Sequence, residues 1–314
     1  MIQTSSVSLD DIRAAARRIA PHARRTPVLP MERGELGGDF LPNFKLEFCQ
    51  HAGSFKTRGA FNSLLTLENP DRGVAAASGG NHGAAVAYAA RRLGLKARIF
   101  VPEIASPAKV EAIRRFGAEV VIGGARYDDA QAACDAHVAE TGAARIHPFG
   151  AAPTIAGQGT LGLEWAEQAD LDTVLIAVGG GGLIAGIASA FAGTGRKVLG
   201  VEPEGSRALH AALEAGKPVD VSVDSIAADS LGAKNVGPFV HAICRDHVAG
   251  VVLVPDEAIR SAMATLWRDF RLACEPGGAA ALAGLLCGAY RPSAGERVGV
   301  LLCGGNVDLE KIPA

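Results

Sequence analysis

A lysine at the start of a helical run is the first residue whose position suggests covalent chemistry. Lys56 follows Gly53, Ser54 and Phe55, and the run 57–67 has helical composition, with Ser54 as the expected N-cap. The positive end of a helix dipole disfavours a second positive charge, and partial burial adds to this effect. The pKa of such an amine falls, and more of it is a neutral nucleophile. A solvated lysine is the ordinary alternative.

A run of four glycines, Gly179–Gly182, lies between an apolar strand and an apolar helix that begins near Leu183. Backbone N–H groups without side chains around them can approach a phosphate closely, and a helix N-terminus adds partial positive charge. The run therefore predicts an anion-binding loop. A dinucleotide site stays open as an alternative, because Glu202 ends the next strand and a G-x-G-x-x-G/A register from Gly180 ends on Ala185.

A polar loop, Ser78-Gly79-Gly80-Asn81-His82, follows a short apolar strand and opens another helix. Ligands of open parallel sheets gather beyond the carboxyl ends of the strands, and Glu202-Pro203 and Cys303-Gly304-Gly305-Asn306 follow strands in the same way. Amide, hydroxyl and N–H groups at a helix start suit a carboxylate or a phenolate oxygen. Helix capping by Asn81 is the alternative. The remaining histidines are scattered and form no metal-binding pattern.

The composition argues against several classes of protein. Lys plus Arg number 31 and Asp plus Glu number 33, giving a net charge of -2, whereas nucleic-acid or anionic-membrane surfaces normally show a basic excess. We therefore expect neither partner. The apolar run 173–192 is interrupted by the four glycines, which disfavours a membrane span, and the first residues lack the apolar core of a secretory signal. Six cysteines without close pairing are expected to be free thiols in a reducing cytoplasm.

Apolar strands alternate with amphipathic helices along most of the 314 residues, which predicts parallel sheets covered by helices. The pattern forms two series, so we expect an α/β fold with two lobes, each an open, mostly parallel sheet flanked by helices. A first helix begins after a capping pair, Ser8 and Asp11. The other expected elements are strands at 74–77, 96–101, 119–122, 173–178, 198–202 and 298–302, an extended segment at 44–48, and helices at 82–93, 107–116, 128–140, 160–169, 183–191, 206–215, 256–272 and 278–288.

Taken together, the motifs resemble those of one family, the fold-type II pyridoxal-phosphate enzymes with the tryptophan-synthase-β-like fold. Within this family they are most similar to the serine/threonine dehydratase and serine racemase group. The likeness runs from about Arg25 to Asp308 and rests on several motifs in a fixed order. These motifs are Gly53–Ala60, Ser78–His82, Gln158-Gly159-Thr160, Gly179–Gly182, Glu275-Pro276 and Cys303–Asn306.

The resemblance implies pyridoxal 5′-phosphate (PLP) as cofactor and a role for each motif. Lys56 is the implied catalytic residue, which forms the Schiff base. The implied cofactor-binding residues are Phe55, Lys56, Asn81, Gly179, Gly180, Gly181, Gly182, Leu183 and Cys303, with Asn81 near the cofactor 3-oxygen and Cys303 facing the pyridine nitrogen. The implied substrate-binding residues are Ser78, Gly79, Asn81, His82 and Gln158. Residues 1–66 and 152–314 are expected to form a large PLP-binding domain and 67–151 a small mobile domain.

Three positions bear on the reaction. A thiol at Cys303 cannot keep the ring nitrogen protonated as an aspartate would, which favours prompt loss of a β leaving group. Racemases of the group carry a serine before the Gly-Asn-His of the carboxylate loop, as a second base, whereas this chain has Gly79 there. Elimination is therefore preferred over racemisation. The family's divalent-cation site resembles Glu202 with a carbonyl near Ser206, and the resemblance implies a divalent cation with Glu202 as ligand, although an acid is replaced by Ala208 and one ligand is missing.

The sequence thus predicts a dehydratase that removes water from L-threonine, L-serine or a similar β-hydroxy amino acid and releases a 2-oxo acid and ammonia. The alternatives are a serine racemase, a lyase for 3-hydroxyaspartate or phenylserine, a nicotinamide oxidoreductase, and a non-catalytic cofactor-binding protein. The pocket for the β-substituent is expected around Phe149, Gln158 and 230–234. We expect a cytoplasmic homodimer and, because the chain ends soon after the last strand, no appended allosteric domain.

Overall fold

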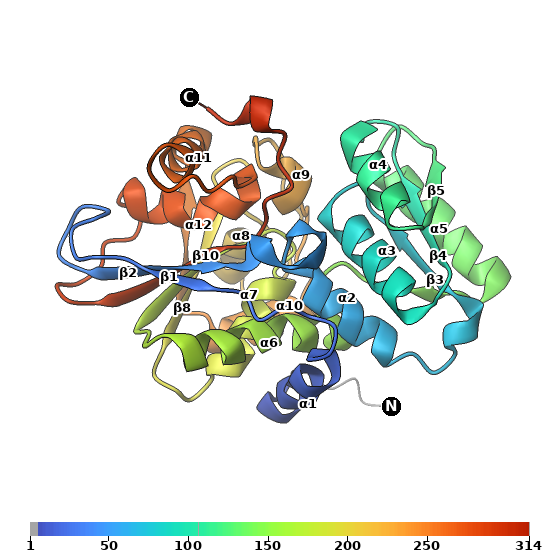
Figure 1. The fold of residues 1–314 in the computed structure, drawn as a ribbon, viewed down its shortest axis with the longest axis horizontal. Helices are drawn as coiled ribbons and strands as arrows, with labels where there is room; N and C mark the ends of the chain where they lie inside the picture. Colours follow the sequence, from blue (N-terminus) through green and yellow to red (C-terminus); the bar gives the residue numbers. More distant parts are fainter. Residues whose placement is uncertain (1–5, 106, 314) are drawn as a thin grey trace.

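The computed structural model describes residues 6–105 and 107–313, which form two β-sheets, each flanked by helices (Figure 1). The larger sheet has six strands in the order β1-β2-β10-β7-β8-β9, and all neighbouring pairs are parallel except β1 with β2. This sheet with its helices is called the larger lobe below. Its strands are β1 (Val28–Pro30), β2 (Leu41–Leu46), β7 (Thr173–Ala177), β8 (Lys197–Pro203), β9 (Gly250–Val254) and β10 (Arg297–Leu302).

The second sheet is entirely parallel and lies on the right in Figure 1, within the expected segment 67–151. Its strand order is β5-β4-β3-β6, and with its helices it is called the smaller lobe. The mobility and the domain limits of this segment stay predictions. The elements are β3 (Val74–Ala77), α3 (Asn81–Leu93), β4 (Ala97–Val101), α4 (Pro107–Arg115), β5 (Glu119–Ile122), α5 (Tyr127–Thr141) and β6 (Ala144–Arg145).

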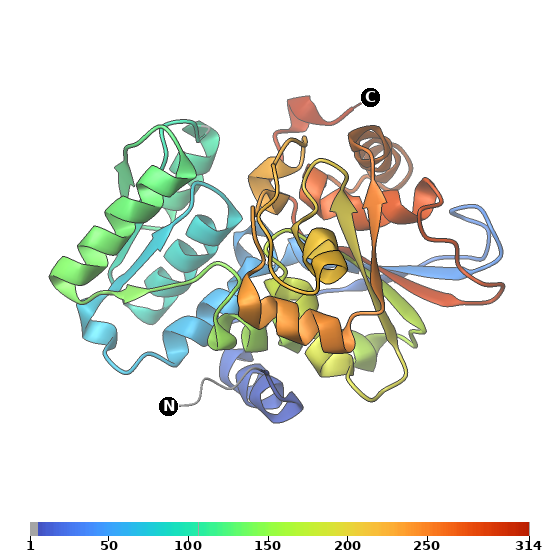
Figure 2. The same ribbon diagram turned by 180° about the vertical axis from the view of Figure 1, so that it is seen from behind.

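Most helices of the larger lobe form the main hydrophobic core with the larger sheet, which is seen from behind in Figure 2. Ala60, Phe61 and Leu64 instead belong to a second core, which they share with α3. Every residue of β7 is buried, as expected of a central parallel strand, and α12 packs on β7 and β10. The two-lobed α/β fold is therefore confirmed. The helices are α1 (Leu9–Ile19), α2 (Lys56–Leu65), α6 (Ala152–Gln168), α7 (Gly182–Phe191), α8 (Ala208–Ala215), α9 (Ala228–Leu231), α10 (Gly237–His247), α11 (Asp256–Phe270) and α12 (Pro276–Leu286).

The helix before the glycine quartet is longer than expected, because α6 begins at Ala152 rather than at Thr160. The glycines of this helix lower its helix propensity, which hides it in the sequence. A Cβ on Gly157 would lie 2.7 Å from the Gly59 Cα, and Gly159 is similarly close to α7. These glycines let α6 pack closely on α2 and α7. The elements β1, β9, α9 and α10 were not expected from the sequence.

The helix that begins at Lys56 is not capped as expected. Phe55 occupies the N-cap position of α2 and makes no capping bond with its side chain. Ser54 forms an antiparallel β-bridge with Gly304, and its hydroxyl is buried without a hydrogen-bonding partner in the described part of the chain. The predicted N-cap role of Ser54 is therefore wrong, because tertiary pairing draws its backbone away from the helix. The capping box of Ser8 and Asp11 at α1 is confirmed.

A buried cluster of charged side chains fixes α2 in place. Arg58 donates from Nε and Nη2 to the two oxygens of Glu47, at 2.6 and 2.9 Å, and from Nη2 to Glu164 at 2.9 Å. Lys45 donates to the other oxygen of Glu164 at 2.5 Å. Two cations and two carboxylates balance each other here, and their mutual hydrogen bonds offset the cost of burying charge. The cluster therefore anchors the helix that carries Lys56 to β2 and α6.

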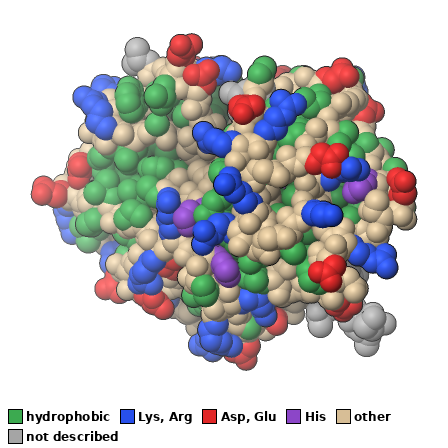
Figure 3. All heavy atoms as spheres, turned by 45° about the vertical axis from the view of Figure 1, so that its right-hand side comes forward, with side chains coloured by type: hydrophobic (Ala, Val, Ile, Leu, Met, Phe, Trp, Pro, Cys, Tyr) green, Lys and Arg blue, Asp and Glu red, His purple; other side chains and the backbone are tan. Residues whose placement is uncertain are grey.

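The distribution of charge on the surface and the state of the cysteines can be compared with what the composition predicts. Charged side chains of both signs are interspersed on the face shown in Figure 3. All six cysteines are free thiols. Across residues 6–105 and 107–313, no helix combines the length and the apolar character that crossing a bilayer requires.

Candidate active site

Lys56 is the half-buried first residue of α2, and its amine makes a hydrogen bond within the protein. Nζ donates a hydrogen bond to the Pro148 carbonyl oxygen at 2.7 Å and lies 5.1 Å from the centre of the Phe55 ring. Burial lowers the pKa of the amine to about 8, although Cys303 and Glu275 oppose the shift. A larger fraction of this amine is neutral near pH 7 than of a lysine in solvent, in line with the sequence-based expectation.

The carbonyl group that accepts this hydrogen bond belongs to a turn at 147–150. His147 Nδ1 accepts hydrogen bonds from the backbone N–H groups of Phe149, at 3.2 Å, and Gly150, at 2.7 Å. Burial lowers the pKa of His147 to about 4, so the ring is neutral and can accept at Nδ1. His147 is one of the scattered histidines to which the sequence assigned no metal-binding pattern, and no motif marks it. Its bonds turn the chain so that Pro148 faces the amine.

The glycine quartet is packed so closely that side chains would not fit. A Cβ on Gly180 would lie 2.2 Å from the Phe149 ring, and one on Gly182 would lie 2.5 Å from the Phe149 carbonyl oxygen. Gly181 has φ +78°, a left-handed conformation that favours glycine. The quartet leads directly into α7, where Leu183 is buried. The first N–H groups of α7 have no partner within the helix, so they are available to an anion.

The amine and the quartet are joined by two consecutive residues. Pro148 accepts the hydrogen bond of Lys56, and Phe149 packs on Gly180. On the other side, a Cβ on Gly179 would meet the Leu231 backbone at 2.8 Å. A loop without side chains at a helix N-terminus suits the phosphate of PLP, and an amine beside it suits the carbonyl group of PLP. The residues present therefore fit the cofactor that the resemblance implies.

Asn81 is the first residue of α3 and reaches across to the larger lobe. Its Nδ2 donates to Glu275 Oε1 at 2.5 Å, and its Oδ1 accepts from Asn306 Nδ2 at 2.8 Å. The N-cap position of α3 is Gly80, so the alternative role of Asn81 as a helix cap is not realised. The side chain instead connects three segments that are distant in the sequence.

Ser78 and Gly79 precede Asn81 in the same loop. The Gly80 N–H donates to Ser78 Oγ at 3.2 Å, which folds the hydroxyl back onto the loop. A Cβ on Gly79 would lie 2.7 Å from the Ala105 Cβ and 3.0 Å from a Val101 side-chain carbon. Packing therefore requires a very small residue at position 79. A serine there, as the racemase pattern has it, would need the segment at Ala105 to shift.

Two residues that are expected to bind substrate, His82 and Gln158, make side-chain hydrogen bonds to the protein backbone. His82 is buried, its Nε2–H donates to the Ile146 carbonyl oxygen at 2.9 Å, and burial lowers the pKa of the ring to about 3. Gln158 Oε1 accepts from the Gly59 N–H at 3.3 Å, between α6 and α2. Both side chains are thus part of the framework, and their contact with substrate stays a prediction.

Cys303 follows the carboxyl end of β10 and is buried. Its Sγ lies 3.6 Å from the Gly277 carbonyl oxygen, and burial raises the pKa of the thiol. The side chain therefore stays an uncharged thiol, as the expectation for this position requires. Its backbone carbonyl accepts from the Phe55 N–H at 3.0 Å, which places Cys303 next to the start of α2.

Glu275 is a residue of this region to which sequence reasoning gave no role beyond a family motif. It occupies the N-cap position of α12, is 5% exposed, and accepts the hydrogen bond from Asn81. Burial raises the pKa of its carboxyl group to about 7, although the Asn81 hydrogen bond, Lys109 and Lys56 lower it. The Glu-Pro pair signals a helix start in the sequence, but nothing there signals the contact with Asn81.

Glu202, the expected cation ligand, has a different role. Both carboxylate oxygens accept backbone hydrogen bonds, from the Leu209 N–H at 2.9 Å and the His210 N–H at 2.8 Å, at the start of α8. Burial raises the pKa of Glu202 to about 7. Within the described ranges, no three His, Cys, Asp or Glu side chains gather as a metal site. The expectation of a cation near Glu202 is therefore unsupported, because its oxygens bind the helix.

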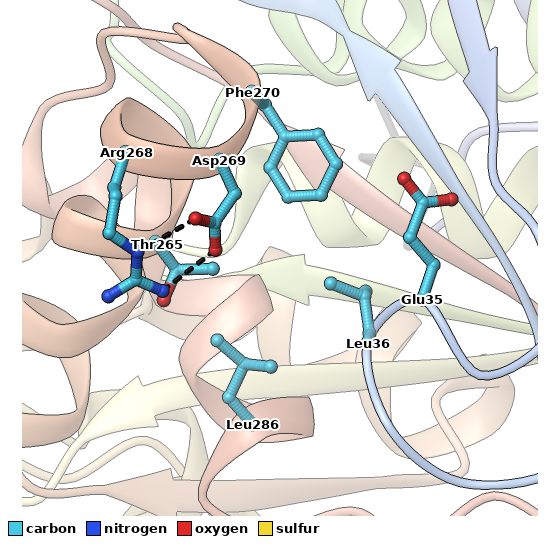
Figure 4. A pocket seen from close by; sticks show the side chains of 7 residues that line it. All are labelled: Glu35, Leu36, Thr265, Arg268, Asp269, Phe270 and Leu286. Atoms are coloured by element: carbon cyan, nitrogen blue, oxygen red, sulfur yellow. Dashed lines mark hydrogen bonds and ion pairs between the residues drawn. The ribbon is translucent and has the colours of Figure 1, made fainter.

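A cavity of about 360 Å³ lies elsewhere, beside α11 and α12 (Figure 4). Arg268 and Asp269 at its wall bind each other at 2.7 Å. None of the motif residues lines it, so we assign it no part in the chemistry. Its lining residues are Glu35, Leu36, Thr265, Arg268, Asp269, Phe270 and Leu286.

Comparison with known proteins gives consistent matches over nearly the whole chain. The model of a family described as "Pyridoxal-phosphate dependent enzyme" matches residues 19–304. Phenylserine dehydratase of Ralstonia pickettii is 42% identical over 319 residues, covering 98% of this chain and 97% of that protein. Serine racemase of Oryza sativa subsp. indica is 35% identical, covering 97% and 92%. The crystal structure of a T.th. threonine deaminase has a TM-score of 0.90 at 40% identity, covering 96% of this chain and 99% of that one.

Proposed function

Because the chain belongs to the family of pyridoxal-phosphate dependent enzymes, we propose that it is a dehydratase, a lyase that removes water from a β-hydroxy amino acid and releases a 2-oxo acid and ammonia. The observation that carries the proposal is the Lys56 amine, which has a lowered pKa and lies beside a glycine quartet at a helix N-terminus. L-Threonine and L-serine are the proposed substrates. Phenylserine is the second candidate, which the likeness to the Ralstonia pickettii protein supports.

Each motif has a distinct task in this reaction. PLP held between Lys56 and the glycine quartet would supply an electron sink for the electron pair left on the substrate α-carbon. Lys56 Nζ removes the α-proton, since its lowered pKa leaves part of the amine neutral near pH 7. The start of α3, with the backbone after Gly80 and the hydroxyl of Ser78, binds the substrate carboxylate, while the remaining N–H of Asn81 faces the cofactor. The quartet Gly179–Gly182 and the N-terminus of α7 hold the cofactor phosphate.

The packing at Gly79 favours elimination over racemisation. Racemisation needs a second proton donor on the face of the α-carbon opposite Lys56. Position 79 carries no side chain, and Ala105 blocks the space where one would go. The hydroxyl of Ser78 is turned back toward Gly80. We therefore propose serine racemisation as a minor activity at most.

The proposal extends to cofactors, assembly and location. It includes no divalent cation, since the carboxylate of Glu202 binds the start of α8. We propose a homodimer in the cytoplasm, on the support of the family resemblance and of the free thiols. Light scattering should then give twice the chain mass of 32.2 kDa.

The proposed function is tested by supplying the PLP-loaded protein with L-threonine, L-serine, phenylserine and 3-hydroxyaspartate and measuring 2-oxo acid release. We expect product from at least one of them, and chiral analysis of serine should show little D-isomer. Lys56→Ala should abolish both product and the yellow colour of the bound cofactor, while the exposed-site variant Lys96→Ala should retain both. Product at the wild-type rate from Lys56→Ala would contradict the assigned roles. A bound dinucleotide, or cofactor binding without turnover of any substrate, would support the oxidoreductase or the non-catalytic alternative.

A further inference from the structure

Glu275 is a buried carboxyl group beside the proposed site that the reaction above does not use. It lies at the start of α12 in the larger lobe, and it is 5% exposed. Its one side-chain hydrogen bond in the described part of the chain comes from Asn81, across the boundary between the lobes. A buried acid with a single polar side-chain partner is costly, so its presence beside a ligand-binding residue needs an explanation.

The contacts of Asn81 leave its amide only one orientation. Nδ2 donates to Glu275, and Oδ1 accepts from Asn306, whose Nδ2 also donates to the Ala52 carbonyl oxygen at 2.8 Å. A flip of the Asn81 amide would place its oxygen against the carboxyl oxygen of Glu275. The same flip would place its NH2 group against the NH2 group of Asn306. Because an amide nitrogen carries two hydrogens, one N–H of Asn81 remains for a ligand.

The two partners of Asn81 are connected by backbone hydrogen bonds to the segment that precedes Lys56. The Gly305 N–H donates to the Gly53 carbonyl at 3.0 Å, and the Glu275 N–H donates to the Gly304 carbonyl at 3.2 Å. Gly304 also makes room for the contact, because a Cβ there would lie 2.0 Å from Glu275 Oε1. These backbone hydrogen bonds therefore hold Glu275 and Asn306 next to the start of α2.

We propose that Glu275 is a positioning residue: acting through Asn81, it fixes the start of α3 to the larger lobe, so that Asn81 presents a single N–H donor to the cofactor. The inference rests on the proposed function, since Asn81 matters to the chemistry only where the cofactor is bound beside it. A lone N–H donor favours an ionised oxygen over a hydroxyl group as its partner, and the ring oxygen of PLP is such a group.

The charge of Glu275 adds a second, measurable property. Burial raises the pKa of the carboxyl group to about 7, and Lys109 of α4 and Lys56 of α2 oppose this. The other titratable groups that interact with it are the thiols of Cys303 and Cys274, which burial keeps neutral. The Asn81 hydrogen bond is stronger when its acceptor is ionised. The environment of the bound cofactor should therefore change as Glu275 titrates in the neutral range.

The test is a double-mutant cycle on the affinity of the apoprotein for PLP, followed by visible absorption without any substrate. Glu275→Ala and Asn81→Ala should each weaken PLP binding about tenfold, since the first frees the half-buried Asn81 amide and the second leaves the buried Glu275 carboxyl group unpaired. The double variant should bind within about twofold of Asn81→Ala alone, because residues that act through one another are not additive. Additive losses, or a Glu275→Ala variant with wild-type affinity, would overturn the proposal.

A second variant keeps the test decisive if the alanine variants do not fold. Glu275→Gln retains an oxygen acceptor for Asn81 but cannot ionise, so PLP affinity should stay within about threefold of wild type. The neutral-range pH titration of the bound cofactor's absorption should disappear. Glu296→Gln, at the opposite end of β10, is the matched control and should keep that titration. An unchanged titration in Glu275→Gln would contradict the proposal. Because no substrate is used, this outcome is separate from a failure to find dehydratase activity.

Discussion

The amine of Lys56 and the ring of His147 are connected through one carbonyl group. His147 Nδ1 holds the N–H groups of Phe149 and Gly150, and this turn directs the carbonyl of Pro148 to the amine. A carbonyl acceptor favours the charged amine, whereas burial disfavours it. The lowered pKa of Lys56, about 8, shows that burial prevails. Near neutral pH the residue therefore exchanges readily between the proton-carrying and proton-accepting forms.

The stability of the apoprotein should reflect this titration. The pKa of Lys56 is about 8 when folded and 10.5 ordinarily, so the unfolded state binds more protons between these values. Raising the pH through this window should therefore stabilise the folded state, and below it the contribution should be constant. The measurement compares the free energy of unfolding of wild-type and Lys56→Met apoproteins in urea. Their difference should rise with pH across the window, and a flat difference would indicate an ordinary, solvated amine.

At the scale of elements, α2 is held by buried charges rather than by a cap. The first turn of α2 has no side-chain cap, and Arg58, two residues after Lys56, carries the contacts to Glu47 and Glu164. The position of the amine therefore depends on this cluster as well as on the Pro148 carbonyl.

Arg58→Lys should be strongly destabilising despite keeping the charge. Lysine cannot reproduce the two-point contact with Glu47, so part of a buried carboxylate is left without a partner. We expect a loss of roughly 2–4 kcal/mol in the free energy of unfolding, together with weaker PLP binding. Arg98→Lys, in the exposed pair with Glu119, is the control and should cost less than about 1 kcal/mol. Equal effects of the two variants would show that the cluster does not anchor α2.

The start of α8 gives a second prediction at this scale, on metal removal. The oxygens of Glu202 accept the Leu209 and His210 N–H groups, so Glu202→Ala should lower the free energy of unfolding by about 1–3 kcal/mol. Treatment of the wild type with EDTA should leave both stability and 2-oxo acid release unchanged. A loss on EDTA treatment that Mg²⁺ restores would show that a cation contributes after all.

At the scale of the whole molecule, the contacts between the lobes at the site are polar. Asn81 is hydrogen-bonded to Glu275, Lys234 pairs with Asp128 at 3.1 Å, and Lys109 of α4 pairs with Asp229 of α9. Exposed ion pairs contribute little to stability, so the pair of Lys234 and Asp128 can break and reform at low cost. Such a boundary suits two bodies that move relative to each other.

Substrate binding should therefore change the motion of the smaller lobe. In the PLP-loaded protein, α-methylserine can bind but has no α-proton to lose, so the bound state persists. We expect slower amide hydrogen exchange at 78–82 and at 229–234 with this ligand, because both segments lie at the boundary between the lobes. The segment at β1 and β2 is the internal reference and should not change. Equal exchange with and without the ligand would contradict the mobility expected of 67–151.

Local patterns in the sequence were enough to predict the alternation of strands and helices and the main motifs. Local signals carry this information: the capping box of Ser8 and Asp11, the mostly apolar strand at β7, and the glycine quartet at the start of α7 all depend on residues close together in the chain. The lysine motif was also recognisable, because its residues are consecutive. The environment of Lys56 followed from general electrostatics, since a helix start and burial both disfavour the charged amine.

Only the tertiary structure decided how the site is held together. Asn81 and Glu275 are 194 positions apart, and Lys56 and Pro148 are 92 apart. Contacts at such separations leave no periodicity or spacing in a single sequence, so Glu275 had no assigned role. Ser54 is a local prediction that a distant contact overturned. Its residue type predicts a helix cap, but pairing with Gly304 removes it from the helix. Chain order sets which residues can form an element, whereas packing between distant segments sets which polar groups meet.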